Sequence, residues 1–459
     1  MPVFGGPARG TGWECREVTE GMSLRYRILR AVLVVVAFAA APVSAGPAVA
    51  PAPRSVDGGV LLPDSEGTIT ELLVHFAPEM EYEQAPVLRD LFLSLSGETR
   101  LLVLCPSTES VEHFVKEWGQ LAGWRGREVY VINVGVDISI WARDRRFSRY
   151  NPVDGLPART FVPAPFADYE FWQLNEMMVP FLLGATGLTT EAFTSPLRIE
   201  GGNAVTSGSR LFTGTNVFVD NEDEDHPAEF IVDEIEQMFG ITPILVGDAS
   251  GQVPWCHVDM YLTPVDDNTV LVASPVLASS LLTWAPDDDL FCDEEGGCLL
   301  DVATDALAYQ DRFDQVADQL REQGFNVLRL PAVVDEPDDW MMTYNNVLME
   351  ERNGRRIVYM PVYNVTTLDV AAAAVYSSLG FDVETIDVSR LFPWGGTIRC
   401  TVNVTSRRPR TTPAPVDHPA GHLVVIDLAQ KPDRAVQIHP AGGRALAPQH
   451  PEALLPSVN

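Results

Sequence analysis

Between residues 67 and 408 the sequence alternates repeatedly between strand-like and helix-like patterns. The apolar runs 100–105 and 128–134 are typical of buried strands, and the segment between them, 110–123, has apolar residues at helical spacing. A helical pattern at 227–240 ends in glycine and is again followed by an apolar run. Repeated strand–helix units predict a mixed α/β fold, and their irregular spacing argues against a solenoid.

Some local structure is also predicted. Asn353 and Gly354 separate two strand-like runs, and this residue pair favours a tight hairpin turn. The segment Ser139–Asp144 is predicted to end a strand, and His257–Asp259 to lie in an extended segment.

The two ends of the chain differ in composition from this region. Arginines precede the apolar run 31–43, and a small-residue pattern follows at 43–45, so residues 1–45 resemble an export signal. Met22 is the more natural start of that signal. The run has about 13 residues, fewer than the roughly 20 that span a bilayer. A secreted or periplasmic protein is therefore expected, with no membrane span once the signal is removed.

Pro, Ala and Gly dominate the segments that flank the α/β region. We expect a linker at 46–66, a catalytic domain at 67–408 and a poorly ordered tail at 409–459 with one short apolar run. The formal net charge is −31, which argues against nucleic acid and anionic membrane surfaces as partners, because both require a basic face.

The six cysteines leave one open question. Cys292 and Cys298 flank an acidic loop and are the best candidates for a disulfide, while Cys105 ends an apolar run and is expected in the core. Removal of the signal takes away Cys15 and leaves an odd number of cysteines. Cys400, after a Gly-Gly turn, can be a stray thiol, half of a disulfide or a nucleophile.

Three short segments contain charged residues in unusual surroundings. His257 and Asp259 lie on the same side of an extended segment and can pair a base with a cation-binding carboxylate, although they can also merely share a strand. Asp144 lies among arginines. Glu200 precedes two glycines, which form a plain turn or allow close approach of backbone or ligand.

Five segments in this order resemble the agmatine deiminase and bacterial peptidylarginine deiminase family of guanidine-modifying enzymes. They are Trp141–Asp144, Glu200–Gly202, His257–Asp259, Tyr344–Asn346 and Gly395–Cys400. The resemblance spans roughly residues 67–408. It implies the pentein fold, a five-bladed α/β propeller of ββαβ units in a single catalytic domain.

The resemblance also implies roles for individual residues. The catalytic set is Cys400 as nucleophile, with His257, Glu200, Asp144 and Asp259. Substrate contacts are implied for Asp144, Asp259, Trp141 and Asn346.

Arg145 and Arg146 depart from the family pattern. We expect one of them to enter the cleft and pair with a substrate carboxylate, such as that of a C-terminal arginine. The alternative is that both balance acidic residues on an exposed loop.

The predicted function is that of a secreted guanidine deiminase acting on peptidyl-arginine or agmatine. The alternatives are an amidinotransferase or other guanidine hydrolase of the same fold, and a non-catalytic binding protein for cationic ligands. No cofactor or metal is expected, since the acidic segments 220–225 and 287–295 lack the spacing of a calcium loop.

Overall fold

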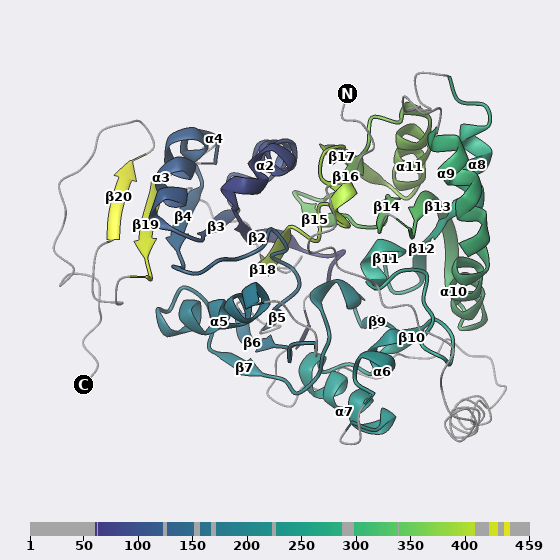
Figure 1. Cartoon of the computed structure of the whole chain (residues 1–459), viewed down its shortest axis with the longest axis horizontal. Coiled ribbons are helices and arrows are strands. Elements are labelled where there is room, and N and C mark those ends of the chain that lie inside the picture. Colours follow the sequence, from purple (N-terminus) through teal and green to yellow (C-terminus); the bar gives the residue numbers. More distant parts are fainter. Residues whose placement is uncertain are drawn as a thin grey trace.

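The structure, a computed structural model, describes residues 60–61, 63–122, 126–150, 157–166, 171–222, 226–286, 298–337, 339–408, 422–429 and 436–440. Within these residues the strands form five sheets. Figure 1 shows the sheets arranged around a common centre, with the helices on the outside. This arrangement is expected of a five-bladed propeller.

Each sheet is listed here by its strands in spatial order. The sheet that joins both ends of the domain contains β18 (Val402–Arg408), β2 (Thr68–His75), β3 (Arg100–Cys105), β4 (Glu128–Asn133), β19 (His422–Asp427) and β20 (Val436–Pro440). The next contains β1 (Val60–Leu61), β5 (Phe147–Tyr150), β6 (Pro157–Val162) and β7 (Ala192–Thr194). The third contains β10 (Ile244–Val246), β9 (Arg210–Gly214) and β8 (Val205–Ser207). The fourth contains β11 (Leu262–Pro264), β12 (Thr269–Ser274), β13 (Asn326–Asp335) and β14 (Trp340–Thr343). The fifth contains β15 (Leu348–Arg352), β16 (Arg355–Val362) and β17 (Phe381–Asp387).

The helices connect strands within these sheets or join one sheet to the next. They are α2 (Glu81–Ser94), α3 (Thr108–Glu117), α4 (Gly119–Ala122), α5 (Phe171–Ala185), α6 (Asn216–Asp220), α7 (Ala228–Phe239), α8 (Pro275–Leu282), α9 (Leu299–Asp305), α10 (Gln310–Glu322) and α11 (Thr366–Ser378). Short 3-10 helices are η1 (Pro78–Met80), η3 (Gly201–Asn203), η4 (Val258–Met260), η6 (Ala306–Tyr309) and η7 (Phe392–Trp394).

One structural unit recurs in all five sheets. Two antiparallel strands are followed by helix and then by a third strand that runs parallel to the second, as in β15–β16–α11–β17. The same pairing holds for β5–β6–β7, β8–β9–β10, β11–β12–β13 and β18–β2–β3. This is the ββαβ unit that the sequence resemblance implied.

Local sequence signals explain several of the element boundaries. Ser107 caps α3 by accepting a hydrogen bond from the backbone N–H of Ser110, and Ser274 caps α8 in the same way. Gly240 ends α7 in the left-handed region, at φ 71°. The predicted hairpin is present, because Asn353 and Gly354 both have positive φ between β15 and β16.

The ring of sheets is closed by segments from opposite ends of the domain. β18 pairs antiparallel with β2, and the Thr70 hydroxyl bonds the Ser406 hydroxyl across a sequence separation of 336 residues. Apolar side chains on both faces of this sheet are buried, with Leu72, Val74 and Val402 on one face and Leu73 on the other. Cys105 at the end of β3 is fully buried, as predicted.

The structure differs from the sequence predictions in four segments. Ser139–Asp144 forms turns and not the end of a strand, because β5 begins only at Phe147. Asp259 lies in η4, so His257–Asp259 is not extended throughout. The tail contributes β19, which pairs parallel with β4, and β20. The expected linker contributes β1 and the ordered residues 63–66.

Some predictions concern residues that the structure does not describe. The export signal, Cys292, residues 223–225 of the first acidic segment and all of the second lie outside the described residues. Cys298 is disulfide-bonded, and its pairing with Cys292 stays a prediction. No helix within the described part of the chain is long and apolar enough to cross a bilayer.

Candidate active site

The five motif segments occupy equivalent places in the five blades. Each lies directly before the first strand of its unit: Asp144 before β5, Glu200 before β8, His257 and Asp259 before β11, Asn346 before β15 and Cys400 before β18. Since these strands surround the centre of the molecule, the segments converge there (Figure 1). The repeat of the fold therefore explains why residues so far apart in the sequence meet.

Cys400 is held in a buried turn. Its side chain is 5% exposed, and its carbonyl accepts a hydrogen bond from the backbone N–H of Arg143. Asn346 donates its side-chain N–H to Cys400 Sγ at 3.3 Å and accepts hydrogen bonds from the Thr397 hydroxyl and the Arg399 backbone N–H. Asn346 thus positions the Cys400 thiol, and the substrate contact predicted for Asn346 stays a prediction.

Trp141 packs closely against the Gly-Gly turn before Cys400. A Cβ atom on Gly396 would lie 2.5 Å from the Trp141 ring and 3.1 Å from Cβ of Cys400. Only glycine lets the indole approach this closely. Trp141 therefore forms a wall beside the cysteine.

His257, Glu200 and Arg145 form a buried chain of charged groups. His257 Nε2 lies 2.6 Å from Glu200 Oε2, and the other carboxylate oxygen of Glu200 pairs with Arg145 Nη2 at 2.8 Å. Burial alone would lower the pKa of His257, but the hydrogen bond and charge of Glu200, with Asp144 and Asp259, raise it to about 10. Burial opposes ionisation of Glu200, yet Arg145 and His257 hold its pKa below the usual value. At neutral pH His257 is an imidazolium and Glu200 a carboxylate.

The two glycines after Glu200 are required by this arrangement. A Cβ atom on Gly201 would lie 2.0 Å from the Arg143 carbonyl oxygen, and one on Gly202 would lie 2.5 Å from His257 Nδ1. Both contacts are closer than real Cβ atoms allow. The close approach that the sequence suggested therefore involves the protein's own backbone and the His257 ring.

Asp144 and Asp259 each present one free oxygen. Both side chains are buried, and Oδ1 of each accepts no hydrogen bond from any described residue. Both carboxylates also act on the Cys400 sulfur, since their charges contribute to raising its pKa. Two buried acceptors without donors, beside a cysteine, suit a cation that carries N–H groups.

Arg399 is a buried cation that the sequence analysis did not single out. It donates Nη1–H to Asp259 Oδ2 at 2.6 Å and Nη2–H to Asp64 Oδ2 at 2.9 Å and to the Ala204 carbonyl at 3.1 Å. Its position next to Cys400 in the sequence was the available signal. Asp64 gave no such signal, because it lies in the Pro- and Ala-rich segment.

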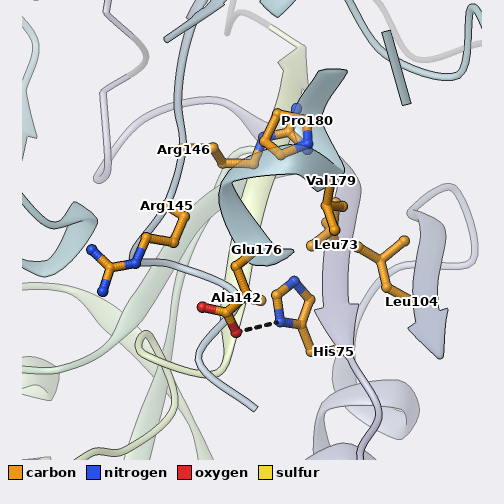
Figure 2. Close-up of a pocket in the computed structure, with 9 residues that line it drawn as sticks. All are labelled: Leu73, His75, Leu104, Ala142, Arg145, Arg146, Glu176, Val179 and Pro180. Atoms are coloured by element: carbon orange, nitrogen blue, oxygen red, sulfur yellow. Dashed lines mark ion pairs between the residues drawn. The ribbon is translucent and has the colours of Figure 1, made fainter. Parts of the chain in front are cut away.

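Arg145 and Arg146 do not occupy the places predicted for them. Both are 4% exposed, so neither lies on an exposed loop, and Arg145 is engaged by Glu200. Arg146 Nη2 lies 3.4 Å from the Thr160 hydroxyl. Figure 2 shows both arginines lining a small cavity with His75 and Glu176. The Arg145 guanidinium orients Glu200 through this contact, and the expected pairing of one of the two arginines with a substrate carboxylate stays a prediction.

The histidine and the glutamate that line the cavity are both uncharged near pH 6. Burial lowers the pKa of His75 to about 4 and raises that of Glu176 to about 7. The 3.7 Å contact between them, dashed in Figure 2, is therefore not an ion pair there. His75 Nδ1 lies 2.8 Å from the Ser139 carbonyl oxygen, and Glu176 accepts hydrogen bonds from the Ser139 N–H and hydroxyl.

The ionisation of Asp144 and Cys400 depends on what fills the site. Burial, and then the charge of Glu200, raise the pKa of Asp144 to about 8. Burial, followed by Asp259 and Asp144, raises the pKa of Cys400 well above its usual value. Without a ligand the site thus contains a neutral carboxyl and a thiol, and a bound cation favours the charged form of both.

Comparison with known proteins identifies the family. The family model of the Porphyromonas-type peptidyl-arginine deiminases matches residues 77–405, most of the chain. The chain belongs to this family. That result confirms the resemblance seen in the sequence.

Solved structures agree on the fold. An agmatine deiminase of C. jejuni has 17% identity and a TM-score of 0.54, and the match covers 78% of this chain and 100% of that one. An agmatine deiminase of Enterococcus faecalis has 13% identity and a TM-score of 0.52, with 80% and 100% covered. No curated protein matches the sequence significantly. The Porphyromonas-type deiminase described here has the predicted pentein fold and is a guanidino-modifying hydrolase of amidine carbon–nitrogen bonds.

No cluster of three or more potential metal ligands occurs among the residues that the structure describes.

Proposed function

We propose that this deiminase hydrolyses the guanidino group of peptidyl-arginine or of agmatine to a ureido group and ammonia, through a covalent intermediate on Cys400. The supporting observation is the pair of buried, unpartnered Oδ1 atoms of Asp144 and Asp259 beside the cysteine. A guanidinium is a planar cation whose N–H groups form a fork, and two carboxylate oxygens match that fork.

The first half of the reaction forms the covalent intermediate. The bound guanidinium favours loss of the Cys400 proton, and the thiolate attacks the central guanidinium carbon. The carbon–nitrogen bond to one terminal nitrogen breaks, and His257 gives that nitrogen a proton so that it leaves as ammonia. Because Nε2 faces Glu200, the proton to be transferred is the one on Nδ1. A thiouronium on Cys400 remains.

The second half releases the product. Neutral His257 takes a proton from water, and the oxygen attacks the thiouronium carbon. The carbon–sulfur bond then breaks, its electron pair returns to Cys400 as thiolate, and the hydroxyl proton is lost as the ureido carbonyl forms, so that the thiol is restored by a proton from solvent. Glu200 and Arg145 keep His257 oriented through both steps, as the third group of a catalytic triad does.

The order of the two substrates is argued from the names of the family and of the solved relatives, and from the predicted export signal. The family is named for peptidyl-arginine, and the solved relatives are named agmatine deiminases. The predicted export signal favours peptides or other arginine compounds found outside the cytoplasm. We therefore place peptidyl-arginine first and agmatine second.

A substrate panel tests the proposal. Purified protein is incubated with N-acyl-arginine amide, an arginine peptide, free arginine, methylated arginine and agmatine, and both ureido product and ammonia are measured. Equal amounts of the two products, highest for peptidyl-arginine, are expected. An amidinated amine acceptor would instead identify a transferase, and binding without turnover a binding protein.

The raised pKa of Asp144 predicts how binding depends on pH. Below about pH 8 Asp144 is protonated in the empty site, so a guanidinium must displace its proton. Affinity should rise about tenfold per pH unit up to that pKa and then level off, since the substrate cation does not titrate in this range. Turnover should fall again as His257 loses its proton near pH 10.

Calorimetry in two buffers of different ionisation enthalpy measures this proton directly. We expect the Cys400→Ser variant, which lacks the thiol proton, to release close to one proton per bound N-acyl-arginine amide at pH 6.5. Release should be close to none at pH 9.5. An affinity that is constant between pH 6 and 8 would contradict the assignment of Asp144.

A further inference from the structure

The Arg399 guanidinium contacts the Asp259 carboxylate, the same group that is proposed to bind the substrate guanidinium. Its Nη1 donates to Asp259 Oδ2 at 2.6 Å, while Asp259 Oδ1 stays buried and unpartnered. The side chain of Arg399 is 4% exposed and that of Asp259 1%. Arginine and carboxylate groups often pair through two parallel hydrogen bonds, which here would occupy both oxygens of Asp259.

The second arm of Arg399 is held elsewhere. Nη2 donates to Asp64 Oδ2 at 2.9 Å and to the Ala204 carbonyl at 3.1 Å. Asp64 is itself fixed against β8, since its Oδ2 accepts the Thr206 N–H at 2.8 Å and its own N–H donates to the Thr206 carbonyl at 3.0 Å. The Asp64 carboxylate is thus built into the wall beside Arg399.

Asp64 lies outside the part of the chain that resembles the family. The family model begins at residue 77, and Asp64 belongs to the segment predicted to be a linker. Burial opposes ionisation of Asp64, but Arg399, Arg143 and Arg407 hold its pKa below the usual value, so it carries a charge at neutral pH. This chain therefore adds a charged group to the site from a segment before the family domain.

We propose that Asp64 is a positioning residue that keeps Arg399 from closing on Asp259 with both arms. By taking Nη2, Asp64 restricts Arg399 to one oxygen of Asp259 and leaves Oδ1 for the substrate guanidinium. Without the Asp64 charge, Arg399 turns toward Asp259, forms the two-armed pair and competes with the substrate. Arg399 of the same chain then inhibits substrate binding at Asp259. This inference rests on the proposed function, because it assumes that Asp259 binds a guanidinium.

The test begins with Asp64→Asn. The amide oxygen still accepts the Thr206 N–H, so β8 stays in place while the charge is lost. KM for N-acyl-arginine amide should rise about tenfold or more, the cost of one competing charged hydrogen bond, with kcat changed much less. Glu66→Gln, an exposed acidic residue of the same segment, is the matched control and should match wild type. Thermal unfolding of both variants detects any loss of stability.

Combining Asp64→Asn with Arg399→Lys separates this proposal from an ordinary structural ion pair. A lysine offers one point contact and cannot form the two-armed pair. The double variant should therefore recover most of the KM lost in Asp64→Asn alone. A double variant that is no better than Asp64→Asn would overturn the proposal, as would a KM of Asp64→Asn within twofold of wild type.

The two proposals fail separately. If wild-type protein makes no ureido product from any guanidino compound, the proposed function is wrong. In that case, the affinity of Cys400→Ser for N-acyl-arginine amide, with and without Asp64→Asn, still decides the role of Asp64. Equal affinities would refute it, and a tenfold weaker affinity with Asp64→Asn would support it.

Discussion

Replacing Cys400 by serine is expected to lower ammonia release by roughly a thousandfold or more, the scale seen when a catalytic nucleophile is removed. Serine has nearly the same shape, so the turn before β18 should be kept. Its hydroxyl, however, is far harder to ionise than a thiol, even beside a bound guanidinium. Initial rates of ammonia and ureido release, measured with N-acyl-arginine amide, provide the comparison.

A control variant and a mass-spectrometry measurement accompany this experiment. Cys256→Ser changes the half-buried cysteine directly before His257, which forms no disulfide, and should keep most of the activity. Mass spectrometry of wild-type protein quenched during turnover should find the thiouronium adduct on the peptide that contains Cys400. A Cys400→Ser variant that retained more than a few per cent of wild-type activity would exclude the covalent mechanism.

Asp144→Asn and Asp259→Asn should each reduce kcat/KM strongly. Each substitution removes one charged acceptor from a buried site and leaves the substrate cation short of a partner, a loss of about 2–5 kcal/mol. That corresponds to roughly thirtyfold to several thousandfold in rate. The same kinetic assay applies to both variants.

The two carboxylates should differ in one respect. Asp144→Asn should also abolish the rise in affinity between pH 6 and 8, because that rise is assigned to the Asp144 proton. Asp318→Asn, which alters an exposed carboxylate on α10, serves as the control and should behave as wild type. Near-normal kinetics in either site variant would remove that residue from the guanidinium site.

The fold could be predicted from the sequence, as could the segments that meet at the centre of the ring, because both leave local signals. The strand and helix patterns follow from burial of one face of each element, and the motifs place polar, charged or glycine residues beside apolar ones. Glu200 with Gly201 and Gly202 is an example, since Gly201 admits the Arg143 carbonyl and Gly202 admits the His257 ring.

The partners of the charged residues could not be predicted. Arg145 follows Asp144 in the chain, but its side chain reaches Glu200 from another blade, and this depends on how two blades face each other. Arg399 looked like an ordinary spacer within the cysteine motif, although it pairs with Asp259 from one blade and Asp64 from another. Such pairs are properties of the closed ring, and no periodicity in the sequence encodes them.

The segments that differed from prediction were short or unusual in composition. Ser139–Asp144 has the apolar character of a strand but turns, because Arg143 must reach the carbonyls of Gly201 and Ala204. The tail was predicted to be poorly ordered apart from one short apolar run, and that run forms β19 and pairs with β4. The strand β20 lies in the part that was predicted to be poorly ordered.

Because β18 closes the ring of sheets, the site can be completed only at a late stage of folding. Cys400 directly precedes β18, which pairs with β2 near the other end of the domain. Contacts across so many residues form late and slowly compared with local ones. In the proposed mechanism, a chain still being synthesised therefore carries Asp144, Glu200 and His257 without the nucleophile, and a complete but unfolded chain carries a thiol without the groups that activate it. A protein that works in this way cannot modify arginine compounds in the cell that makes it until the last blade has closed.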